Sequence, residues 1–171
     1  MAYSRSLVER IRHVVSVHKP TAGSGERKMN LRNMFPNARY SSPATERLIA
    51  EAQRALGVTL PEELRNFYLQ CDGFREDRGN AKYLFSLLDE DTIGSLVTIT
   101  RYFWQQVSVP DLSAFVFFGS SGGGEFWGIS LQKPLEIIAY HHNMEDQFEV
   151  VGSRIQDVWE SDYALYDEVD Q

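Results

Sequence analysis

Residues 56–74 read LGVTLPEELRNFYLQCDGF, and this stretch predicts the end of one helix and the whole of the next. Gly57 can adopt the left-handed conformation that closes a helix, and Pro61 suits the first position of the following helix, where its missing N–H is not needed. Asp72-Gly73 then predicts the end of this second helix. Four apolar residues fall at i, i+3, i+4 and i+7 and therefore share one helical face: Leu64, Phe67, Tyr68 and Cys71. We expect a core helix with a fixed start and end.

The segments before this stretch divide into a helix and a basic extension. The helix is predicted to begin at Ser42-Pro43, a capping residue followed by proline. Its buried face would consist of Leu48, Ile49, Ala52, Ala55 and Leu56. Residues 1–40 form the extension, with an amphipathic helix over about residues 6–18, a linker, and no strong element over residues 26–40. That helix could bind a membrane surface or a partner groove, although such helices more often pack on their own domain.

The segments after this stretch are predicted to be mainly strands. Five apolar or β-branched runs are strand candidates: residues 83–88, 114–118, 125–131, 135–141 and 148–151. Short links between consecutive strands imply an antiparallel arrangement, and the flanking helices make the class α+β. Residues 92–107 fit either a strand, by β-branched content, or a helix, by the spacing of Leu96, Ile99 and Phe103. Ser153 is predicted to cap a last helix.

Three motifs in this order resemble the SUKH superfamily, which includes the fungal Smi/Knr-type cell-wall regulators and many bacterial immunity proteins. They are the stretch 56–74, the segment FFGSSGGGEFWGI over residues 117–129, and VVGS at 150–153 before the last helix. The resemblance covers roughly residues 42–160, with Asp72-Gly73 where Asn-Gly is usual and nothing to match residues 1–40. It implies a helix from about Ser95. It also implies a single SUKH-like α+β domain over residues 41–171, with a mainly antiparallel twisted sheet of about four to six strands and helices packed around it.

The charge of the chain is unevenly distributed around its net value of −7. Residues 1–40 hold eight Lys/Arg and two Asp/Glu, a sum of +6. Residues 41–171 hold nine Lys/Arg and 22 Asp/Glu, a sum of −13, and they include a short acidic tail. An acidic body attracts basic proteins and repels nucleic acid, so no direct nucleic-acid binding is expected. Acidic surfaces also serve solubility, and this alternative stays open.

Two further segments carry residue types found in catalytic or metal sites. Residues 119–123 satisfy the G-x-S-x-G pattern of serine hydrolases, but that chemistry requires a helix after the serine, and the residues that follow favour a strand. His141 and His142 are adjacent on a predicted strand end, so they point to opposite faces and do not chelate one ion well. Cys71 is the only cysteine and reads as a buried apolar residue. We therefore expect no enzyme activity, no cofactor and no metal.

No apolar run approaches the ~20 residues of a membrane span, and the N-terminus lacks the apolar core of a secretory signal. We therefore expect no membrane span and a cytoplasmic protein.

The resemblance implies a binding role, most directly that of an immunity protein that neutralises a cognate toxin, for which a basic nuclease would suit the acidic body. The alternatives are a regulatory scaffold of the Smi/Knr type and, as the competing class, a serine hydrolase using residues 119–123. The candidate partner-binding residues are the loop carboxylates, because loops on a rigid sheet commonly carry function. They are Asp89, Glu90 and Asp91 in one loop and Glu145, Asp146 and Glu149 around another.

Overall fold

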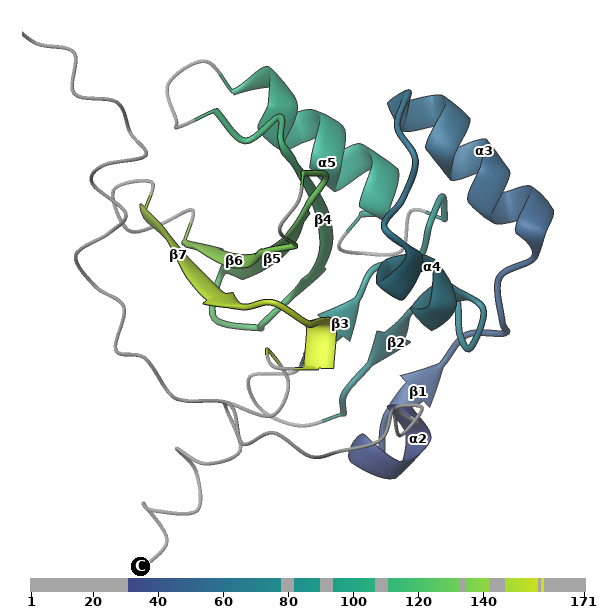
Figure 1. The fold of residues 1–171 in the computed structure, drawn as a ribbon. Helices are drawn as coiled ribbons and strands as arrows, with labels where there is room; N and C mark the ends of the chain where they lie inside the picture. The colour runs from purple at the N-terminus through teal and green to yellow at the C-terminus, as the bar shows by residue number, and fades with distance from the viewer. Residues whose placement is uncertain are drawn as a thin grey trace, which may run out of the picture.

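The computed structural model describes residues 31–77, 82–89, 94–106, 111–132, 135–141, 147–156 and 158. These residues form one antiparallel sheet of seven strands in the order β1-β2-β3-β4-β5-β6-β7, with helices packed against it (Figure 1). The strands are β1 Arg39–Tyr40, β2 Phe74–Arg75, β3 Tyr83–Leu84, β4 Phe115–Ser120, β5 Glu125–Ser130, β6 Ile137–His141 and β7 Gln147–Gly152. The helices are α2 Leu31–Met34, α3 Glu46–Leu56, α4 Glu62–Tyr68 and α5 Leu96–Gln105. The predicted α+β class is confirmed, although the sheet has more strands than the four to six expected.

The strands β1 and β2 account for the larger number of strands. The expectation that residues 26–40 hold no strong element was wrong, because α2 and β1 lie there. Phe35 is buried after α2, and its ring stacks on that of Phe74 with centroids 5.0 Å apart. The Tyr40 hydroxyl lies 2.8 Å from the carbonyl oxygens of both Leu31 and Phe35 and can donate to either. Elements of two to four residues are too short to show a periodic pattern in the sequence. Aromatic packing between distant residues holds α2 and β1 in place. The helix and linker expected before residue 31 lie outside the described residues.

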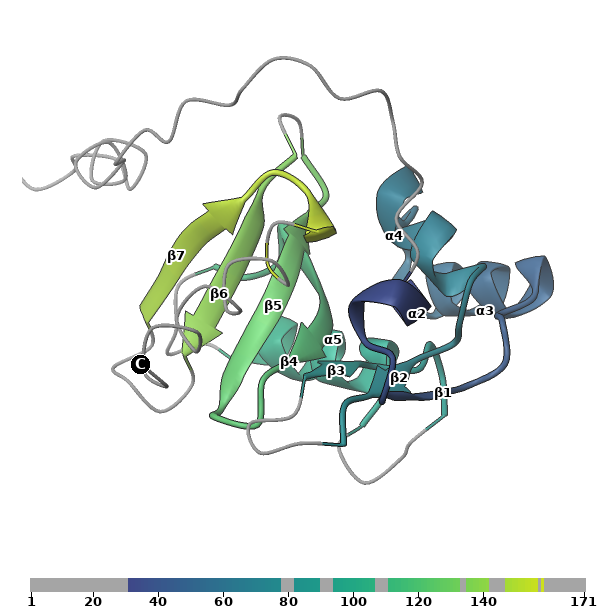
Figure 2. The same cartoon turned by 90° about the horizontal axis from the view of Figure 1, so that it is seen from below.

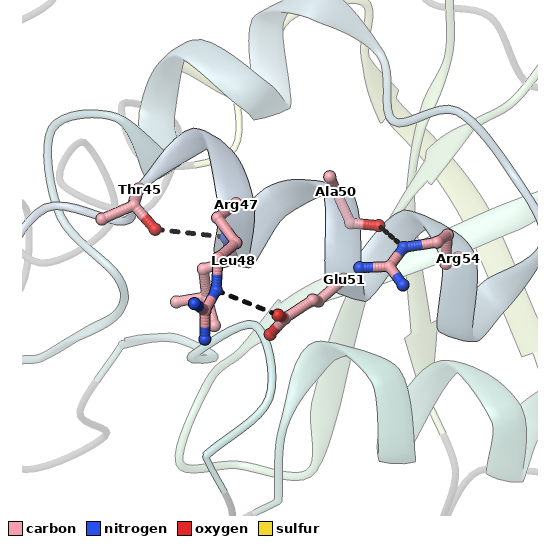
Figure 3. Close-up of polar contacts among 6 residues, drawn as sticks. All are labelled: Thr45, Arg47, Leu48, Ala50, Glu51 and Arg54. Atoms are coloured by element: carbon pink, nitrogen blue, oxygen red, sulfur yellow. Dashed lines mark hydrogen bonds and ion pairs between the residues drawn. The ribbon is translucent and has the colours of Figure 1, made fainter.

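The boundaries of α3 follow from its caps. The helix begins at Glu46 rather than at Ser42-Pro43, because the Thr45 side chain accepts a hydrogen bond from the Leu48 N–H at 3.2 Å (Figure 3). Gly57 closes it in the left-handed conformation, with φ of 73°. The exposed face carries the Arg47–Glu51 pair drawn in the same figure, and the opposite face buries Ile49 and Ala52.

Helix α4 occupies the stretch predicted to organise the fold. Pro61 is its N-cap residue rather than its first helical residue, so the helix begins one position later than expected. All four residues of the predicted apolar stripe are buried, with exposures of at most 3% (Leu64, Phe67, Tyr68 and Cys71). The predicted buried stripe is therefore confirmed, but the predicted end is wrong, because α4 ends at Tyr68 rather than at Asp72-Gly73 and Cys71 lies beyond the helix.

The strand register gives the sheet two differently packed faces. Phe126 lies opposite Tyr140, and this face packs on α5, where the Phe103 ring is 5.0 Å from that of Phe126 and 5.1 Å from that of Tyr140. The other face presents Trp127 opposite Ala139, and these two residues share the larger core cluster with the apolar residues of α3 and α4. Figure 2 shows β4 to β7 side by side, with β1 and β7 at opposite ends of the sheet.

Helix α5 lies where the resemblance placed it, and polar contacts fix it to β4. Ser95 caps the helix through a reciprocal capping box with Thr98. Thr100 is fully buried, and its Oγ1 accepts the Phe117 N–H at 3.0 Å. The Trp104 Nε1–H donates to the Phe115 carbonyl oxygen at 2.8 Å. These bonds satisfy strand groups beside the register shift between Phe117 and Gly119.

None of the described helices is long and apolar enough to cross a membrane.

Candidate functional site

The loop that follows β3 and carries Asp89 is hydrogen-bonded to other elements at several points near its start. The Phe85 N–H donates to the Phe118 carbonyl oxygen at 2.9 Å, and the buried Tyr68 hydroxyl donates to the Phe85 carbonyl oxygen at 2.8 Å. The Leu96 N–H at the start of α5 donates to the Ser86 carbonyl oxygen at 2.8 Å. Three different elements therefore position this loop, so an exposed side chain on it is presented in a defined place.

Asp72 anchors the same loop from the end of the α4 stretch. Its carboxylate accepts the Leu87 N–H at 2.8 Å, and only 8% of the residue is exposed. Burial raises the pKa of Asp72 above its ordinary value; the Leu87 N–H opposes the shift, and the nearby Asp89 charge adds to it. The next residue, Gly73, has φ of 102°, and a Cβ there would lie 3.1 Å from the Leu84 carbonyl oxygen. The Asp-Gly pair is therefore suited to close contact with this loop.

The raised pKa of Asp72 makes stability depend on pH. A carboxyl whose pKa is higher in the folded than in the unfolded chain favours folding when protonated and opposes folding when ionised. The free energy of unfolding should therefore lose this contribution as pH rises from the unfolded value of 3.8 through the higher folded value. Asp72→Asn keeps an oxygen acceptor for Leu87 and removes the charge. Its stability relative to the wild type should increase over that pH range and then level off, as measured by urea unfolding at a series of pH values.

Asp89→Asn provides the control, because it removes the neighbouring negative charge while leaving Asp72 in place. In the Asp89→Asn background, the stability difference that Asp72→Asn produces should be smaller, since less of the pKa shift would remain. Parallel stability profiles for the wild type and Asp72→Asn across this range would contradict the assignment.

The candidate partner-binding carboxylates are only partly within the described residues. Asp89 is exposed, and its carbonyl oxygen accepts a hydrogen bond from the Ser86 hydroxyl. Glu149 is exposed on β7, opposite Ala139. The other four lie outside the described residues (Glu90, Asp91, Glu145 and Asp146). The strands β4, β5 and β6 separate β3 from β7, so the sheet does not make Asp89 and Glu149 neighbours. Their role in binding stays a prediction.

The G-x-S-x-G segment forms a tight turn between two strands. Gly119 belongs to β4, and β5 begins at Glu125, so no helix follows Ser121. The Ser121 N–H donates to the Glu125 carbonyl oxygen at 3.0 Å, and its own carbonyl oxygen accepts the Gly124 N–H at 3.3 Å. Gly124 has φ of 87°, as the turn requires. This arrangement lacks the strand–turn–helix geometry that activates a nucleophilic serine.

An esterase assay tests this interpretation of the turn. The purified chain should not hydrolyse short acyl esters above the buffer rate, and Ser121→Ala should change neither that rate nor the fold measured by circular dichroism. The physical reason is that the turn supplies no helix N-terminus to stabilise an oxyanion. Turnover that the wild type shows and the Ser121→Ala variant loses would contradict it.

The remaining reactive side chains are one cysteine and two adjacent histidines. Cys71 is buried, and desolvation raises the pKa of its thiol to about 11, which disfavours the nucleophilic thiolate. His141 ends β6 opposite Gln147, and His142 lies outside the described residues. Within the described part of the chain, no group of three His, Cys, Asp or Glu side chains could hold a metal ion. The expected lack of a metal or cofactor stays a prediction.

Sequence reasoning missed one contact that holds the C-terminal part of the domain. The Glu63 carboxylate in the first turn of α4 accepts the Ile155 N–H at 2.8 Å. Ile155 and Val158 are buried in the larger core cluster. The two partners are 92 residues apart, so spacing alone carried no signal for this pair.

These features define an α+β domain in which the described residues form a packed core. Residues 43–161 match the model of the SMI1 / KNR4 family (SUKH-1). Because the match covers more than half of the chain, the chain belongs to this family, which confirms the resemblance seen in the sequence. A comparison with curated proteins finds no match. Domains of this family are generally non-catalytic, and membership suggests that the chain acts through protein–protein interaction.

Proposed function

We propose that the chain is an immunity protein that neutralises a cognate basic toxin, of the nuclease kind, by direct stoichiometric binding without catalysis. The observation that carries this proposal is the charge of residues 41–171, which sum to −13. Asp89 is exposed on a loop that three elements hold in place. A nuclease domain binds phosphates with basic side chains, so exposed carboxylates can compete for the same contacts.

The six predicted carboxylates would act first through the rate of association. Opposite charges steer a partner toward the surface, and salt weakens this steering as the Debye length falls from about 10 Å at 0.1 M to about 3 Å at 1 M. The proposed mechanism is therefore occupation of the toxin's phosphate-binding site by these carboxylates.

The test begins with capture of the partner by the immobilised full chain and then measures its activity. A nuclease partner should lose its activity when an equal molar amount of the chain is added. A partner whose activity is unaffected would contradict neutralisation. It would favour the second candidate function, a regulatory scaffold of the Smi/Knr type, for which the family description itself provides support.

The contribution of the acidic loop is predicted separately. Asp89→Lys should slow association with the captured partner by about tenfold, because one reversed charge changes the local attraction by ~1 kcal/mol or more at low salt. Surface-based kinetics at several salt concentrations provide the measurement. Glu136→Lys is the matched control, since Glu136 is also exposed and is outside the predicted set. Equal effects of the two variants would mean that only net charge matters.

A further inference from the structure

The face of the sheet that packs on α5 carries two arginines at its β1 end. Arg39 and Arg75 are cross-strand partners, and Arg75 is in turn opposite Tyr83. Cross-strand partners point to the same face, so the three side chains form one row. Tyr40, Phe74 and Leu84 form the neighbouring row, which points to the core. Two like charges are therefore held side by side on the surface of an otherwise acidic domain.

The contacts around this pair orient the guanidinium groups and leave them accessible. Arg75 lies over the Tyr83 ring, with its Cζ 5.2 Å from the ring centroid. Arg39 contacts Asp77 through one Nη2–Oδ2 distance of 3.2 Å, and 79% of the Arg39 side chain stays exposed. An exposed single-contact ion pair is weak and exchanges readily with another carboxylate. Like charges directly opposite each other on neighbouring strands destabilise a sheet. An anion bound between the two guanidinium groups would relieve this repulsion.

The geometry suits a short acidic segment better than a nucleic acid. Guanidinium groups bind carboxylates through two parallel N–H···O bonds, and side chains directly opposite on adjacent strands are about 5 Å apart at Cβ. Two carboxylates at positions i and i+2 of an extended chain point to the same side and lie about 7 Å apart, a separation that the long arginine side chains can span. Nucleic-acid affinity depends on many phosphate contacts, whereas this row offers two cations within a domain whose charge repels a longer polyanion.

We propose that Arg39 and Arg75 form a docking point for an extended acidic segment of a second partner protein. The site consists of other residues than the acidic surface of the proposed function, and the proposal does not depend on that function. Arg39 and Arg75 lie on β1 and β2, whereas Glu149 lies on β7, at the other end of the sheet (Figure 2). One domain would thus present groups of opposite charge to two different kinds of partner.

A titration followed by nuclear magnetic resonance tests this site on the full chain. The probe is the peptide Gly-Ser-Glu-Gly-Glu-Ser-Gly, and its counterpart with glutamine in place of glutamate is the neutral control. The acidic peptide should shift the side-chain Nε–H signals of Arg39 and Arg75 along one saturation curve, and the neutral peptide should not. No shift of these signals at millimolar peptide would overturn the proposal.

Two variants with the same net charge distinguish a specific site from the electrostatic field of the whole domain. R39E/R75E should weaken binding by about tenfold or more, because both charge-assisted contacts are lost. R47E/R54E changes the net charge equally on the exposed face of α3 and should leave the affinity within about twofold. Equal losses in both variants would overturn a specific site. Circular dichroism of both variants verifies the fold.

Two other occupants would also overturn the proposal. An oligothymidine of equal length that shifts the same signals more strongly than the acidic peptide would indicate a nucleic-acid surface. A full chain with the acidic residues after 158 neutralised tests occupancy by the same molecule (E160Q, D162N, D167N, E168Q and D170N). Shifts of the Arg39 and Arg75 signals in that variant, without peptide, would identify the chain's own segment as the occupant. Unchanged signals would support a separate partner.

Discussion

Phe67→Ala should lower the free energy of unfolding by about 3–5 kcal/mol, since it removes a buried aromatic ring and leaves a cavity. Only 3% of Phe67 is exposed, and it belongs to the core cluster that joins α3 and α4 to the sheet. A loss of this size is a large part of the ~5–15 kcal/mol that stabilises a typical domain. Urea unfolding followed by circular dichroism gives the measurement, and the midpoint should fall sharply.

The neighbouring residue offers a control on the same helix. Asn66 is exposed, so Asn66→Ala removes a side chain from the surface of α4 without opening the core. It should change stability by no more than about 0.5 kcal/mol. If Phe67→Ala unfolds at the wild-type midpoint, α4 does not organise the core.

The parts of the fold that could be predicted are those in which local signals and burial agree. The stripe on α4 and the four long strands β4 to β7 have enough residues for their periodicity to be recognised. Gly57 marked the end of α3 because a left-handed position there favours glycine. Helix α5 was ambiguous by residue type, because β-branched residues suit a strand; its capping box and the buried Phe103 decide for the helix.

The parts that could not be predicted depend on contacts between distant residues. Strands β1 and β2 have two residues each, and the packing of Phe35 on Phe74 helps to hold them. The Arg39–Arg75 row likewise arises from register, which no local pattern encodes. The acidic character of the candidate site followed from composition, but the buried role of Asp72 did not. Its one signal was an aspartate where the family usually has asparagine.

The glycines of residues 119–123 show how a motif can be structural. A Cβ added to Gly119 would lie 2.5 Å from the Tyr83 carbonyl oxygen and 3.0 Å from the Trp127 Cε3. The first contact is with backbone, so relief would require β3 to move away from β4 at the pair Leu84 and Gly119. The glycine at this position is therefore required by the close approach of two strands.

Gly119→Ala should therefore destabilise the protein by about 1–3 kcal/mol or more, as overpacking of a filled interior does. Gly123→Ala is the matched control in the same turn, because its Cβ would meet only the Ser121 Oγ, at an ordinary 3.7 Å. Urea unfolding of the two variants should give a large loss for the first and almost none for the second. A catalytic motif would instead make both glycines matter for turnover and neither primarily for stability. Equal stability of the two variants would mean that β3 yields at this contact, and the structural explanation of Gly119 would be wrong.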